Sequence, residues 1–282
     1  MNEAQENNST EVQVIEAEEV QLVPMDSGER SEIEMQVATA RKFPRSLKGF
    51  KDQAMSMATL DEETAASCFY VLPRGGKKVE GPGIRLAEIA ALSWGNLRYG
   101  ARTVGETDDR RSIIAEGFAH DLQTNNRVSI RVQRRITDRH GKRYNDDMIA
   151  VTGNAACSIA LRNAVFKIIP MTYINSVYEA AKKLAVGDAT SLVDRREKAM
   201  AHFAKFGIVK ERVLARVGKK SIEDIDLTDL ELLVGLTTAM KDRELSEDEA
   251  FPKVEDGGEK PKTLFDKVKS KAEEKQTTET VL

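Results

Sequence analysis

The chain of 282 residues contains few of the residues that carry redox, metal or nucleophilic chemistry: two cysteines, three histidines and one tryptophan. Cys68 and Cys157 lie in apolar surroundings without paired-ligand spacing, which indicates buried, reduced thiols of a cytoplasmic protein rather than disulfides or zinc ligands. His120, His140 and His202 show no metal-ligand spacing and no pairing with a nucleophile. We therefore expect no bound cofactor or metal and no enzymatic chemistry.

Long apolar runs are also absent. No stretch of about 18 apolar residues occurs, and the first residues are acidic rather than signal-like. The sequence therefore predicts a protein that is neither secreted nor membrane-spanning.

Charge is unevenly distributed along the chain. The first 34 residues contain ten acidic residues and one basic residue, whereas residues 41–183 carry a net positive charge. A basic body with acidic ends is typical of nucleic-acid-binding proteins, where an acidic tail can compete for the binding groove. Acidic ends that only aid solubility are the alternative.

Composition and turn signals divide the chain into four parts. We expect an acidic, disordered tail over 1–34, an α+β core over 35–187, a small helical domain over 190–241 and a disordered polar tail over 244–282. In the core, turns near 107–109 and 124–126 separate three strands, at about 96–106, 111–121 and 127–136. The expected fold is a three-stranded antiparallel meander packed on a long helix over 146–169, followed by further helices.

The segment RVSIRVQRRITDRHGKR, residues 127–143, is the most informative part of the chain. Alternate side chains of a strand point to opposite faces, so one face here is apolar and the other presents arginines to solvent. A row of like charges costs stability unless an anion is bound, which favours an anion-binding face. A solvated edge strand protected by its charges is the alternative. The apolar set is Val128, Ile130, Val132 and Ile136, and the basic set is Arg127, Arg131 and Arg135.

Two other clusters suggest chemistry. The segment RGGKKVEGPG, residues 74–83, lacks the phosphate-loop spacing, so we interpret it as a flexible basic loop that touches a phosphate backbone, or as a plain surface turn. A group of acids invites comparison with a metal-dependent nuclease, although solvated loop acids explain it better. These acids are Glu106, Asp108, Asp109, Glu116 and Asp121.

Three further residues are candidates for the basic surface. Trp94 precedes a Gly-Asn turn, which favours an exposed ring able to stack on bases, whereas most other aromatic residues are expected in the core. Arg162 and Lys167 on the long helix are expected to face the same side as the arginine strand, with ordinary solvated charges as the alternative.

The order of basic loop, short helix, three-stranded meander and long helix resembles the core of phage single-strand annealing proteins of the RecT/Redβ superfamily. The passages that carry the resemblance are GPGIRLAEIAALSWGNLRYG at 81–100, IIAEGFAHDLQTN at 113–125 and AACSIALRNAVFKIIP at 155–170. It covers roughly residues 40–185, and each motif alone has low specificity.

The resemblance implies an ATP-independent protein for phage-type homologous recombination. Such a protein would coat single-stranded DNA and pair it with a complementary strand, through an annealed duplex intermediate, as a ring or helical filament of identical subunits. A partner exonuclease and the host single-strand-binding protein are the implied partners, in the host cytoplasm. By position in the motif order, and with Trp94 from the argument above, the expected DNA-binding residues are Lys77, Lys78, Arg85, Trp94, Arg127, Arg131, Arg135, Arg162 and Lys167.

Two functions from other classes stay open at this point. One is a metal-dependent nuclease that uses the acids at 106–121, and the other is an accessory protein whose basic face binds an acidic partner.

Overall fold

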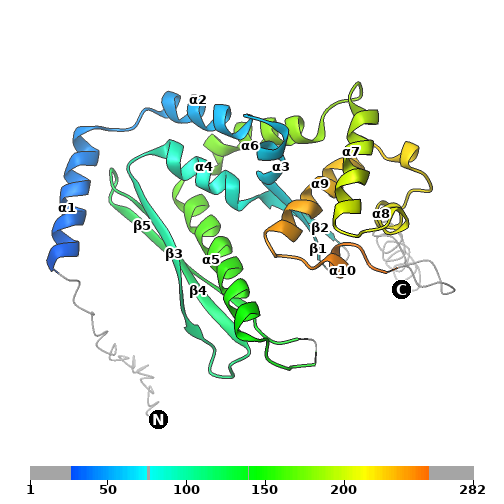
Figure 1. Cartoon of the computed structure of the whole chain (residues 1–282). Helices are drawn as coiled ribbons and strands as arrows, with labels where there is room; N and C mark the ends of the chain where they lie inside the picture. The colour runs from blue at the N-terminus through cyan, green and yellow to red at the C-terminus, as the bar shows by residue number, and fades with distance from the viewer. Residues whose placement is uncertain (1–26, 75–76, 139, 254–282) are drawn as a thin grey trace, which may run out of the picture.

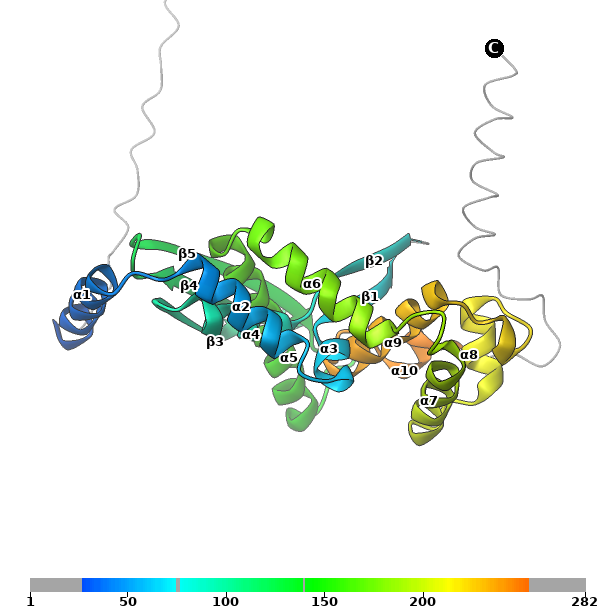
Figure 2. The same cartoon turned by 90° about the horizontal axis from the view of Figure 1, so that it is seen from above.

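The computed structural model describes residues 27–253 apart from residues 75, 76 and 139. The first 26 residues of the tail expected over 1–34, and residues 254–282 of the tail expected over 244–282, lie outside the described residues. Two views show α1 (Ser27–Lys42) at one end of the molecule and α7 (Leu192–Lys205) with α8 (Lys210–Val217) at the other (Figures 1 and 2).

The predicted meander and long helix are confirmed. Strands β3 (Leu97–Glu106), β4 (Ser112–Asp121) and β5 (Asn126–Arg135) form an antiparallel sheet in the order β3-β4-β5. Helix α5 (Asp146–Ile168) lies along one face of this sheet (Figure 1). Asn145 caps the helix by accepting a hydrogen bond from the Met148 backbone N–H, which satisfies one of the free donors of the first turn.

Small residues let α5 approach the sheet closely. A Cβ atom added at Gly117 would lie 2.3 Å from the carbonyl carbon of Ala160, so only glycine fits there. Ile113, Ala115 and Ile136 pack against Ala156 and Ala160 in this layer. The apolar face of β5 is therefore the face that meets α5, as the alternation predicted.

Helix α5 also has the length and the mean hydropathy, 1.2, of a membrane-crossing helix. No other helix among the described residues has both. The packing of α5 against all three strands gives a different reason for that apolarity, because a core helix passes the same test.

The larger core lies where the C-terminal end of α5 meets several other elements. Phe50, Phe69, Leu86 and Ile174 are fully buried there. Contributing elements include α2 (Leu47–Ala58), α3 (Glu62–Ser67), β1 (Phe69–Arg74), α4 (Ile84–Trp94) and α6 (Met171–Val186).

The predicted C-terminal helices are present as α7, α8 and α9 (Leu227–Lys241), with the short η1 (Ile222–Asp224) between α8 and α9. Helix α9 packs on β1 so closely that a Cβ at Gly235 would lie 2.3 Å from a methyl group of Val71. Leu230 of α9 belongs to the larger core. These helices therefore share a core with the α+β part.

Three local expectations are wrong. Helix α1 begins at Ser27, inside the stretch expected to be disordered. The basic loop is instead a hairpin, because β2 (Lys77–Pro82) pairs antiparallel with β1. The chain past residue 244 continues in α10 (Glu247–Ala250), because Phe251 is fully buried beside Phe203 and its backbone carbonyl accepts a hydrogen bond from Arg212.

Candidate functional site

The sheet face that turns away from α5 carries most of the exposed arginines. Strand register places Arg102, Glu116 and Arg131 side by side across the three strands, and Arg98, His120 and Arg127 in the same way. We name this surface the arginine face. It consists of Arg98, Arg102, Glu116, Phe118, His120, Arg127, Arg131 and Arg135.

The arginine face has five arginines and a single acid. Glu116 pairs with Arg131 at 3.1 Å and with Arg102 at 3.6 Å, yet the two arginine side chains stay 72% and 76% exposed. One carboxylate cannot neutralise five guanidinium groups, so the surface keeps a net positive charge and attracts anions. Helix α5 covers the opposite face of the sheet, and Arg102, Arg127, Arg131 and Arg135 are exposed, so most of this face is open to a large partner.

Aromatic and polar groups line the middle strand of the face. The guanidinium carbon of Arg127 lies 5.3 Å from the centre of the half-buried Phe118 ring, within the range of a cation–π contact. Nε2 of His120 lies 2.9 Å from Oδ1 of Asn125, which orients the ring. A basic surface with an accessible aromatic ring is the combination that binds single-stranded nucleic acid, through phosphates and stacked bases.

One end of the arginine face contacts α1. Arg98 lies 3.4 Å from Glu29 and 3.9 Å from Glu32, both on that helix. These acids neutralise Arg98, so Arg102, Arg127, Arg131 and Arg135 are the more available cations.

The structure brings three of the predicted site residues together, namely Arg127, Arg131 and Arg135, all exposed along β5. Sequence reasoning missed Arg98 and Arg102 of β3. Their alternate positions were a signal, but only the strand register shows that they share a face with the β5 arginines.

Trp94 is not an exposed stacking residue, contrary to the prediction. The side chain is buried, its Nε1 donates a hydrogen bond to Asp121 at 3.2 Å, and the Arg45 guanidinium lies 4.5 Å from its ring. Arg45 in turn donates two hydrogen bonds of 2.5 Å to the Asp121 carboxylate. The turn after Trp94 predicted exposure, but this buried ion pair, with partners 76 residues apart in sequence, covers the ring.

Arg162 is likewise not on the arginine face. It is buried on α5, paired with Glu244 at 2.5 Å and stacked 4.6 Å from the centre of the Tyr70 ring. Lys167 is exposed, but it belongs to α5, which lies behind the sheet relative to the arginines. Helical periodicity could not show which side of the sheet the helix would cover.

The remaining predicted cations lie on other elements. Lys77 is exposed on β2, and the neighbouring Lys78 pairs with Glu80 at 2.8 Å and with Glu231 at 2.6 Å. Those carboxylates raise the pKa of Lys78 although burial opposes them. Arg85 pairs with Glu88 at 2.5 Å at the start of α4. The register that assembles the arginine face therefore brings in none of these three residues.

The acids considered for a nuclease do not converge. Glu106 is paired with Arg143 at 2.6 Å, which lowers the pKa of Glu106, and Asp109 accepts a hydrogen bond from Thr107 in a turn. Within residues 27–253, with the gaps noted above, no group of three or more His, Cys, Asp or Glu side chains is placed to hold a metal ion. The geometry gives the nuclease alternative no support.

Both cysteines are free thiols. Cys68 is fully buried, and burial raises the pKa of its thiol to about 12, whereas Cys157 is partly buried on α5. Neither is positioned as a reactive nucleophile, because the thiolate is the reactive form.

Comparison with known proteins gives no relative. No family model matches the chain, and no curated protein and no solved structure matches it.

Proposed function

We propose that this protein binds single-stranded DNA on the arginine face and promotes its annealing to a complementary strand without ATP. The observation that carries the proposal is the open sheet face on which five arginines meet one glutamate. Contacts of arginine with phosphates hold a strand without reading its sequence, so its bases stay available for pairing.

The length of the face sets the contribution of one subunit. A ten-residue strand spans about 33 Å, and Arg127, Arg131 and Arg135 follow one another at about 13 Å along β5. One subunit therefore binds only a few nucleotides, which is too short for stable pairing.

We propose that several copies line up along one strand. Helix α1 exposes 65% of Met35, and Phe43 just after it is 64% exposed, which leaves apolar surface available for a neighbouring copy. Light scattering with and without a long single strand tests this, and a protein that stays monomeric on DNA would contradict it.

The test of DNA binding is a triple variant, Arg127→Ala with Arg131→Ala and Arg135→Ala. We expect binding of a labelled thymidine 20-mer, followed by fluorescence anisotropy, to weaken roughly 10- to 100-fold near 0.1 M salt. The slope of log K against log salt should become shallower by about 2, since each lost phosphate contact removes about 0.7. Annealing of complementary oligonucleotides should fall in parallel.

A matched control removes three exposed lysines from other surfaces: Lys51→Ala, Lys210→Ala and Lys220→Ala. This control changes the net charge by the same amount. If the control and the arginine variant lose equal affinity, binding is a general charge effect and the proposed face is wrong. If neither the wild type nor the control binds DNA but the wild type binds an acidic protein, the function of an accessory protein with an acidic partner replaces the proposed DNA-binding function.

A further inference from the structure

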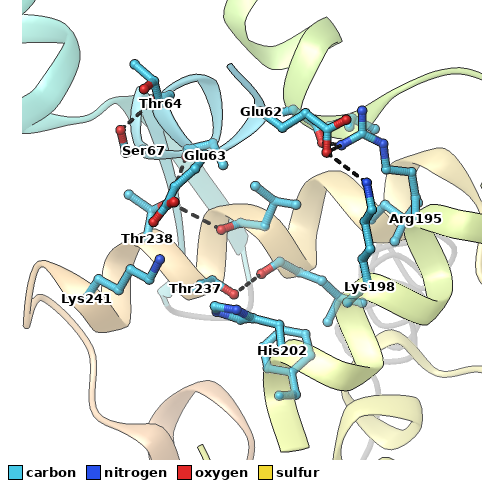
Figure 3. A pocket seen from close by; sticks show the side chains of 18 of the residues that line it. Glu62, Glu63, Thr64, Ser67, Arg195, Lys198, His202, Thr237, Thr238 and Lys241 are labelled. Atoms are coloured by element: carbon cyan, nitrogen blue, oxygen red, sulfur yellow. Dashed lines mark hydrogen bonds and ion pairs between the residues drawn. The ribbon is translucent and has the colours of Figure 1, made fainter. Parts of the chain in front are cut away.

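A cavity of about 1020 Å³ lies between α3, α7 and α9. In the close view, Glu62, Arg195 and Lys198 form one side, Thr64, Ser67 and Lys241 lie on the other, and His202 lies between them (Figure 3). Glu62 is already paired with Arg195 at 2.7 Å and with Lys198 at 3.3 Å.

Two further cations line this cavity without an acidic partner in the described part of the chain. These are Lys205 and Lys241, which form no ion pair within that part. Burial is the largest cause that lowers the pKa of His202, and the charges of Lys241 and Lys205 lower it further. Like charges gathered beside a cavity repel one another unless an anion neutralises them. The arrangement therefore favours an anionic group between Lys205, Lys241 and His202.

Two buried polar atoms of the same lining have no hydrogen-bond partner among the residues that the structure describes: Nε2 of His202 and Oδ2 of Asp242. Leaving such atoms unsatisfied costs about 1–3 kcal/mol each, so a polar ligand gains from pairing with them. A carboxylate oxygen accepts from an amino group, and an imidazole nitrogen donates or accepts according to its tautomer. Nucleobases offer both kinds of group.

The lining also contains an accessible aromatic ring. Phe206 is 36% exposed, and its ring centre lies 5.0 Å from that of His202. A base can stack on such a pair, which contributes about 1–3 kcal/mol per base.

A second cavity, of about 680 Å³, shares part of its lining with this one and is also bordered by residues of α5. Phe206 and Lys241 line both cavities, and Arg135, the last arginine of β5, lines the second one. Arg135 therefore shares a cavity with Lys241 and Phe206, and a strand bound at Arg135 has these two residues of the first cavity nearby.

We infer that the cavity between α3, α7 and α9 binds one nucleoside phosphate unit, with the base on Phe206 and the phosphate at Lys205 and Lys241. The inference rests on the proposed function for the class of ligand. Three acids, Glu62, Glu63 and Asp242, stand among five basic side chains of the lining. That small positive excess suits a single phosphate and disfavours a run of acidic residues, so a nucleotide fits better than an acidic peptide.

The first experiment locates the contact by photo-crosslinking. A 20-mer with one 5-iodouracil is irradiated with the full-length protein, and the crosslinked peptides are identified by mass spectrometry. We expect a crosslink to the peptide that contains Phe206, lost in Phe206→Leu. The exposed position of Phe206 makes this variant safe for folding, and circular dichroism checks it.

The second experiment measures affinity. Lys205→Gln with Lys241→Gln should weaken binding of the 20-mer about three- to tenfold, whereas Lys210→Gln with Lys220→Gln, a matched pair outside both cavities, should not. Calorimetry with deoxyadenosine and deoxycytidine monophosphates distinguishes the source of the ligand. Saturable binding of the monophosphates that is lost in the Lys205/Lys241 double variant supports a site for free nucleotides. Weaker binding of the 20-mer by this variant, without binding of the monophosphates, supports a site for one nucleotide of a DNA strand.

The outcomes separate this inference from the function on which it rests. DNA binding that depends on the β5 arginines, without a Phe206 crosslink and without loss in the lysine pair, overturns the inference and leaves the function standing. Binding of mononucleotides without binding of the 20-mer supports the cavity as a nucleotide site and overturns the proposed function. If a polyglutamate peptide displaces the 20-mer from this cavity and no mononucleotide binds, the inference is also overturned.

Discussion

Glu116 provides the sharpest test of the arginine face, because it is the only acid among five arginines. Its carboxylate holds Arg131 at 3.1 Å and Arg102 at 3.6 Å. A phosphate bound by either arginine would be repelled by that carboxylate. Two unit charges about 7 Å apart repel by about 0.6 kcal/mol in bulk water, and by more at the lower effective dielectric of a protein surface.

Glu116→Gln removes the charge and keeps the shape and a hydrogen-bond acceptor. We therefore expect single-stranded DNA to bind about three- to tenfold more tightly, a gain of about 0.6–1.4 kcal/mol. If the freed arginines take one more phosphate, the salt slope becomes steeper by about 0.7. The loss of folding stability should stay below about 1 kcal/mol, because both arginine partners are largely exposed.

Fluorescence anisotropy between about 50 and 300 mM salt measures both quantities. The matched control is Glu106→Gln, which changes the net charge equally but lies off the face and pairs with Arg143. Tighter binding in Glu116→Gln and little change in the control is the expected result. Weaker binding in Glu116→Gln, or equal effects of the two variants, would refute the placement of DNA on this face.

Three other predictions concern the body of the protein. Gly117→Ala should lower the free energy of unfolding by more than about 3 kcal/mol in urea titrations, because the new Cβ meets the backbone of Ala160. The control, Gly49→Ala in α2, places its Cβ at ordinary contact distances and should raise the free energy of unfolding by up to about 1 kcal/mol. Burial raises the pKa of Asp242 to about 6, and the charge of Glu244 adds to the shift. Between pH 4 and pH 7 the unfolded chain therefore loses this proton before the folded protein does, so the free energy of unfolding of the wild type should fall by about 1–2 kcal/mol as the pH rises, whereas that of Asp242→Asn should not. Parallel pH profiles of the two proteins would contradict this. The single Trp94 should resist acrylamide quenching and keep its emission maximum on addition of DNA, and a shift would show that the buried Arg45 contact opens.

The local sequence was sufficient for the elements of the fold. Alternation over 127–136 identified β5 and its two faces, and turn signals at 107–109 and 124–126 set the boundaries of the meander to within a residue or two. Helix α6 likewise begins after Pro170 and ends before Gly187, two residues that interrupt helices. Periodicity and turn chemistry depend on neighbouring residues, so a single chain carries them without reference to the rest of the molecule.

Only the tertiary structure decided which charged and aromatic side chains share a surface. Arg102 joined Arg131 through strand register, Arg162 was neutralised by Glu244 from 82 residues away, and Trp94 was covered by Arg45. The cavity beside His202 is built from segments that span Glu62 to Asp242. Contacts between distant segments follow from packing of the whole core, and no local pattern encodes them, so the sequence predicted the arginine strand but not the full composition of its surface.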